Sequence, residues 1–261
     1  MLMASIVIFL YIRYKKISLK AKRSTIITLC IAGVLIALHW LAFFGAIKIS
    51  NVSITLAMMS TGAFFTSILE PIFYKRKVIW YEIVLGLLVI CGLYIIFEVE
   101  TRYVNGMLVA LGATFLASIF TLINGKVAKK HRPTMISFYE LTAGMIFISL
   151  YLLFTSQFDA NFFKLPTMDW VYILILATVC TAYAFIASVK VMKHLTPYTI
   201  MLTTNLEPVY GIILAYFILG DAEKMQPQFY YGAVLILATV IANGILKNKR
   251  RKRPVVPTII E

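Results

Sequence analysis

The chain has 261 residues, of which 61% are apolar and only 14% are charged, and its mean hydropathy is +0.88. Soluble proteins carry roughly 45–50% apolar and about 25% charged residues, so a conventional cytosolic enzyme, a disordered tail and a nucleic-acid domain are excluded. The composition predicts an integral membrane protein with most of its mass in the bilayer. The net charge of +14 therefore has to be read from where the basic residues lie.

Apolar runs between charged or turn-rich breaks predict the membrane spans. A helix needs about 20 apolar residues to cross the hydrocarbon core. A short segment at about 1–12 precedes full spans at about 24–46, 53–74, 79–97, 106–125, 135–155, 169–189, 197–219 and 228–246. These runs are long and continuous, which favours helices over the alternating strands of a membrane barrel. We expect the short first segment to be the C-terminal end of a spanning helix whose earlier part is missing or lies differently.

The basic residues predict the orientation of the chain. Excess Lys and Arg mark cytoplasmic loops. All of the 25 basic residues except Lys48, Arg102, Lys164 and Lys224 fall in one set of alternate loops. The pattern predicts a multi-pass protein of the inner (plasma) membrane with a cytoplasmic C-terminus.

The sequences of two regions, about 39–92 and 182–238, resemble each other, and the matching residues follow in the same order. Met58 pairs with Met201, Ser60 with Thr203 and Gly86 with Gly232. By the charge pattern, the helix starting at 53 enters from outside and its partner at 197 from inside. Inverted repeats are typical of secondary transporters, whose site lies near the midplane. The alternative is that apolar helix pairs match by chance in Leu, Ile and Ala.

The stretch 182–244 carries a series of short motifs. These are Thr196-Pro197, Pro208, Leu219-Gly220-Asp221 and Gly232. In these motifs the chain resembles the EamA-type permeases of the drug/metabolite transporter superfamily. The resemblance to the family pattern is weaker over residues 24–97. The resemblance implies an all-α membrane fold of ten helices in two inverted repeats, of which about nine are present here. In that frame 1–105 is a first repeat without its first helix, 106–247 a second repeat, and 248–261 a basic cytoplasmic tail.

Three acids fall within predicted spans: Glu70, Glu140 and Glu207. An ionisable group in lipid is costly and usually marks a pathway. Glu207 lies near the middle of its predicted helix, and Pro208 predicts a kink that lines a polar cavity. We expect Glu207 to bind a cationic or amino group or a coupling proton; the alternative is a structural acid bonded to a neighbouring helix. Glu70 is a second coupling candidate, and Glu140 is expected to be solvated near the cytoplasmic face.

Polar-tipped aromatic residues deep in a span need a partner or a cavity. Together with nearby hydroxyl, amide and carboxyl groups they predict a substrate cavity, with helix packing as the alternative. The expected substrate-binding residues are His39, Trp40, Tyr183, Thr203, Asn205 and Glu207. Structural roles are expected for Pro197, Pro208 and Gly232.

These features predict a secondary transporter that moves a small polar metabolite, amino-acid-like or cationic, by efflux, with the proton as the candidate coupling ion. The sequence has no Walker, HExxH or G-x-S-x-G motif, so no enzyme activity, cofactor or metal is expected. The expected partners are the small-molecule substrate and the lipid bilayer, not nucleic acid, and the oligomeric state is open. The competing classes are an intramembrane enzyme and a non-transporting scaffold or receptor.

Overall fold

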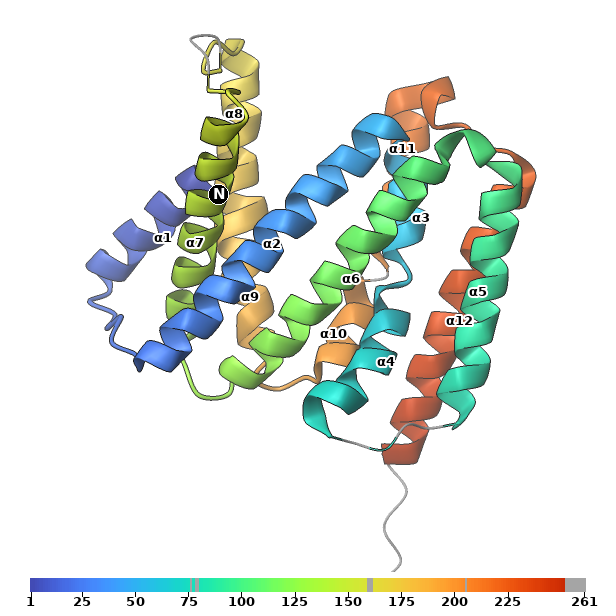
Figure 1. Cartoon of the computed structure of the whole chain (residues 1–261), viewed down its shortest axis with the longest axis horizontal. Coiled ribbons are helices and arrows are strands. Elements are labelled where there is room, and N and C mark those ends of the chain that lie inside the picture. Colours follow the sequence, from blue (N-terminus) through green and yellow to red (C-terminus); the bar gives the residue numbers. More distant parts are fainter. Residues whose placement is uncertain (76, 78–79, 159–161, 205, 252–261) are drawn as a thin grey trace, which may run out of the picture. The chain divides into compact units, whose positions relative to one another are not determined.

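The computed structural model describes residues 1–75, 77, 80–158, 162–204 and 206–251 (Figure 1). All regular structure within those ranges is helical, which confirms the predicted all-α class. In chain order the elements are α1 (Leu2–Tyr14), α2 (Arg23–Ile49), α3 (Val52–Met59), α4 (Gly62–Tyr74), α5 (Trp80–Val99), η1 (Thr101–Tyr103), α6 (Val104–Val127), α7 (Pro133–Phe154), α8 (Thr167–Ile175), η2 (Leu176–Tyr183), α9 (Ala184–Val191), α10 (Pro197–Thr204), α11 (Glu207–Leu219), η3 (Gly220–Glu223) and α12 (Pro227–Arg251).

Within the described ranges, 6 helical stretches are long and apolar enough to cross a membrane. They are Arg23–Ile49, Val52–Tyr74, Thr101–Val127, Pro133–Phe154, Thr167–Val191 and Pro227–Leu246. Shorter apolar helices cover Leu2–Tyr14, Val84–Glu98 and Glu207–Leu219. Large apolar side chains are exposed along these helices, for example Phe154 at 84% and Phe217 at 77%, as a surface facing lipid requires.

The expectation of one continuous helix over 197–219 is wrong. α10 ends at Thr204 and α11 begins at Glu207, so Pro208 lies in the first turn of a new helix rather than at a kink inside one. Proline is well accommodated at a helix start, where its missing N–H costs no hydrogen bond. The predicted span over 53–74 is also interrupted, by a turn at Ser60 and Thr61.

The two interrupted spans have the same dimensions. α3 and α10 each contain 8 residues, and α4 and α11 each contain 13. Equal lengths in the same order are what an internal repeat over these segments implies. The boundaries of the two repeats, and their inverted orientation, stay predictions.

The chain forms two compact units. The first unit comprises Met1–Phe44 and Phe115–Ile200, and the second comprises Gly45–Thr114 together with the chain from Met201 onward. Each unit therefore combines segments from both predicted repeats.

In the first unit, α1 packs against α7 and η2 (Figure 1). The buried residues of α1 recur at every fourth position or nearly so, which places them on one face of the helix. With α7 and η2 they form a core of Ala4, Ile8, Ile12, Leu141 and Ala182. A further core cluster in the same unit contains Leu29, Ala128, Met135, Ile136, Val189 and Met192.

In the second unit, α5 lies along α12 and α11 packs against α3 (Figure 1). The α5–α12 contact includes a close approach of two glycines, Gly92 and Gly232. A Cβ atom at Gly232 would lie 2.8 Å from the carbonyl oxygen of Gly92, and one at Gly92 would lie 3.0 Å from that of Gly232. Only glycine lets the two backbones approach this closely, a common feature of helix packing in membranes.

Candidate functional site

A buried carboxyl and amide pair lies in the first unit, where α6 and α7 form a hairpin around the short loop 128–132. Asn124, one turn before the end of α6, donates a hydrogen bond from Nδ2 to Oε2 of Glu140 at 3.2 Å. Both side chains have relative exposures of 0%. Glu140 lies about 10 Å beyond the start of α7, given the rise of 1.5 Å per residue. The expectation that Glu140 is solvated is therefore wrong.

Three polar atoms around this pair have no hydrogen-bond partner within the described part of the chain: Glu140 Oε1, Asn124 Oδ1 and Ser137 Oγ. Ser137 precedes Glu140 by three residues on α7, so both side chains share one face of the helix. A buried polar atom without a partner costs about 1–3 kcal/mol. All three atoms can accept a hydrogen bond, and two of them belong to the Asn124–Glu140 pair itself.

The chemistry of this pair allows two protonation states, each with a hydrogen bond. When Glu140 is charged, the Asn124 amide donates to it, as in the present geometry. When Glu140 is protonated, rotation of the amide by about 180° lets Asn124 Oδ1 accept from the carboxyl O–H, since an amide presents a donor and an acceptor on opposite sides. The pair can therefore hold a proton or, when charged, a small cation.

Close approach of α2 to α7 covers the Glu140 backbone. A Cβ atom at Gly33 would collide with the Glu140 carbonyl oxygen and lie 2.9 Å from Ala143 Cβ. Conversely, a Cβ atom at Gly144 would lie 2.8 Å from the Gly33 carbonyl oxygen. The two glycines allow the helices to pack backbone to backbone at the level of Glu140.

Three of the predicted cavity residues lie in the first unit. His39, half-buried on α2, stacks on Phe43 with ring centroids 6.1 Å apart and meets Phe120 edge-on at 5.8 Å. Trp40 is half-buried, and Tyr183 ends the π-helical segment η2 with 72% of its surface exposed. π-helical turns are frequent at functional sites, because the wider turn shifts side chains out of the regular register.

The other predicted cavity residues belong to the second unit. Thr203 and Glu207 are exposed on either side of the break between α10 and α11, and Asn205 lies outside the described residues. Glu207 occupies the first turn of α11, where a carboxylate interacts favourably with the helix dipole. The predicted substrate-binding set is thus divided between the two units, and its assembly into one cavity stays a prediction.

The remaining predicted positions are buried in the second unit or at helix starts. Glu70 is 8% exposed on α4, directly before Pro71. Pro197 is the buried first residue of α10, and Pro208 is buried in the first turn of α11. Gly232 lies in the close contact with α5 described above.

Sequence reasoning missed two structural carboxylates, one at the end of η3 and one directly before η1. Glu223 accepts hydrogen bonds from the backbone N–H groups of Val52 at 3.0 Å and Ser53 at 2.8 Å, which caps the start of α3. Glu100 accepts from the backbone N–H of Gln226 at 3.0 Å, at the start of α12. Caps of this kind join segments far apart in the sequence, so no short sequence pattern predicts them.

The Asn124–Glu140 pair could have been predicted from the sequence, because both polar residues lie inside predicted spans that a short loop joins.

The comparisons with known proteins identify the family. No curated protein matches the chain. A solved structure described only as "Crystal structure of protein" is 14% identical, with a TM-score of 0.66, over 96% of this chain and 86% of its own, and this likeness concerns the fold alone. The model of the EamA-like transporter family matches residues 104–244, more than half of the chain. This multi-pass membrane protein therefore belongs to the EamA-like transporter family.

Proposed function

We propose that this chain is a secondary transporter that exports a small polar metabolite, amino-acid-like or cationic, in exchange for protons. The observation that carries the proposal is Glu140, a fully buried carboxyl group within a membrane-spanning helix. Ionisable residues inside the membrane are rare because they are costly, and they mark ion and substrate pathways.

The exchange follows from the two states of the Asn124–Glu140 pair. A charged Glu140 attracts an ammonium or other small cation, and a protonated Glu140 has no net charge to hold it. Proton and substrate therefore compete for one carboxyl group. Such competition couples their movements in opposite directions, provided that the site opens alternately to each side of the membrane.

The predicted cavity residues complete the proposal. His39, Trp40 and Tyr183 would contribute aromatic surface for the apolar part of a substrate or for a cation. Thr203 and Glu207 would contribute polar groups on either side of the break between α10 and α11, and Asn205, outside the described residues, stays a predicted substrate-binding residue. Glu207 and Glu70 are the second and third candidates for coupling, with Glu207 favoured for cation binding because an interrupted membrane helix exposes polar groups of this kind at binding sites.

The proposed location is the inner (plasma) membrane, with the C-terminus on the cytoplasmic side. The support is the asymmetry of Lys and Arg between alternate loops. In this orientation the loop between α6 and α7 faces the cytoplasm. The Asn124–Glu140 pair then lies on the cytoplasmic side of the bilayer midplane.

The proposal is tested by transport into proteoliposomes that contain the full chain. Radiolabelled amino acids, polyamines and cationic drugs are screened with and without an imposed pH gradient. We expect one class of compound to accumulate only with the gradient, and Glu140→Gln to abolish that accumulation. Glu98→Gln, which neutralises an exposed acid of α5, is the matched control and should transport normally. Equal transport by the wild type and Glu140→Gln would contradict the role of Glu140.

A second variant separates the two carboxylates. Glu207→Gln should weaken binding, seen as a raised KM, but should leave the dependence on the pH gradient intact. Loss of the gradient dependence in Glu207→Gln, with Glu140→Gln unaffected, would move the coupling role to Glu207.

A further inference from the structure

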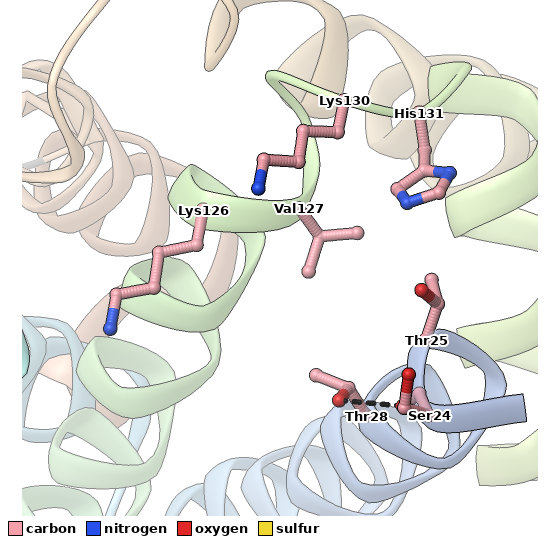
Figure 2. A pocket seen from close by; sticks show the side chains of 7 residues that line it. All are labelled: Ser24, Thr25, Thr28, Lys126, Val127, Lys130 and His131. Atoms are coloured by element: carbon pink, nitrogen blue, oxygen red, sulfur yellow. Dashed lines mark hydrogen bonds between the residues drawn. The ribbon is translucent and has the colours of Figure 1, made fainter. Parts of the chain in front are cut away.

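The first unit also contains a basic pocket that the transport proposal does not use. It has a volume of about 220 Å³ and lies between the first turns of α2 and the end of α6 (Figure 2). Ser24, Thr25 and Thr28 line it from α2, and Lys126, Lys130 and His131 line it from α6 and the loop that follows. Among the described residues that line the pocket there is no Asp or Glu, so its charge is positive.

The two sides of the pocket offer complementary groups to an anion. Figure 2 shows Ser24 and Thr25 of α2 facing His131 across the open space, with Lys130 beside His131 and its side chain directed toward Lys126. α2 begins at Arg23, so Ser24 and Thr25 belong to its first turn, where backbone N–H groups lack partners within the helix. The positive end of the helix dipole and the ammonium group of Lys130 both favour a negatively charged ligand. This combination of helix start, hydroxyls and lysine suits a phosphate group in particular.

The place of the pocket in the membrane indicates the source of the phosphate. α2 and α6 are both long and apolar enough to span the bilayer, and the pocket lies at the start of one and the end of the other. The ends of spanning helices lie at the level of the lipid headgroups, where phosphate is abundant. Basic pockets between membrane helices are known to take anionic headgroups.

We propose that this pocket binds the phosphate of an anionic phospholipid headgroup and holds one lipid molecule against the ends of α2 and α6. The site is separate from the transport function proposed above and does not depend on it. A bound lipid would link the start of α2 to the α6–α7 hairpin through its headgroup.

The test measures lipid retention by the purified full chain in detergent, using native mass spectrometry. Phosphatidylglycerol and phosphatidylcholine are offered in equal amounts, and a third sample receives inorganic phosphate alone. We expect a single retained phosphatidylglycerol molecule in the wild type. Lys130→Gln should lower its affinity about fivefold, since one basic residue contributes about 1 kcal/mol at a lipid surface. Lys130→Arg, which keeps the charge, should retain the lipid.

The matched control is Lys129→Gln, which removes an exposed lysine of the same loop that does not line the pocket. It should bind phosphatidylglycerol like the wild type. Equal losses in Lys129→Gln and Lys130→Gln would overturn the proposal, because they would show only general attraction to a basic surface. Binding of inorganic phosphate with no preference for phosphatidylglycerol would overturn the lipid as the occupant. A Lys130→Gln protein that keeps the wild-type gel-filtration profile and full lipid affinity would overturn the site itself.

Discussion

Replacing Gly232 with alanine probes how closely α5 and α12 approach each other in the second unit. The new Cβ atom would lie 2.8 Å from the carbonyl oxygen of Gly92 and 2.6 Å from Cγ1 of Ile96. The first contact is with backbone, so one helix has to move. Overpacking a core costs about 1–3 kcal/mol, and a contact with backbone places this substitution at about 2–3 kcal/mol. The better helix propensity of alanine offsets about 1 kcal/mol of that cost. We therefore expect the free energy of unfolding to fall by about 1–2 kcal/mol.

Gly112→Ala on α6 is the matched control, because a Cβ atom at Gly112 has no neighbouring atom within 4 Å. That variant should gain up to about 1 kcal/mol from helix propensity alone. The two free energies are measured by unfolding the purified chain in mixed micelles with increasing fractions of sodium dodecyl sulfate, followed by circular dichroism. If Gly232→Ala proves as stable as Gly112→Ala, the backbone contact between α5 and α12 is refuted.

Two further substitutions test buried polar contacts by the same unfolding assay. Asn124→Ala removes the hydrogen-bond donor to Glu140 and should cost about 1–3 kcal/mol, because it leaves a buried carboxyl group without a partner; no loss would show that Glu140 has another partner. Glu223→Ala removes two charge-assisted hydrogen bonds at the start of α3 and should cost about 1.5–3 kcal/mol. Lys224→Ala, at an exposed neighbouring position, should be neutral, and an equal loss there would contradict the capping role of Glu223.

Much of the architecture could be predicted from the sequence, because the bilayer imposes long apolar runs and short polar breaks. The predicted segment 135–155 corresponds to Pro133–Phe154, and 169–189 to Thr167–Val191. The interruptions at Ser60 and before Glu207 could not be seen in the same way. An apolar run reads as continuous whether the backbone is broken or not, because hydropathy carries no information about backbone angles.

The candidate site was harder to predict than the fold. Glu140 was expected to be solvated because it lies only a few turns from the cytoplasmic end of its helix. The position of a residue along a helix does not by itself determine whether its side chain is exposed to water. Its burial depends on a partner from α6 and on the close approach of α2 at Gly33, and both are tertiary contacts. Glu207 drew attention because a proline follows it, and that proline proved to mark the start of a helix.

The competition of proton and substrate for Glu140 is tested most directly by proton release. A transported compound, identified by the proteoliposome screen, is added to the purified chain in weakly buffered detergent solution that contains a pH-sensitive dye. The account predicts that the wild type and Glu98→Gln release protons when substrate binds, and that Glu140→Gln binds no substrate and releases none. Proton release by Glu140→Gln equal to that of the wild type would contradict it.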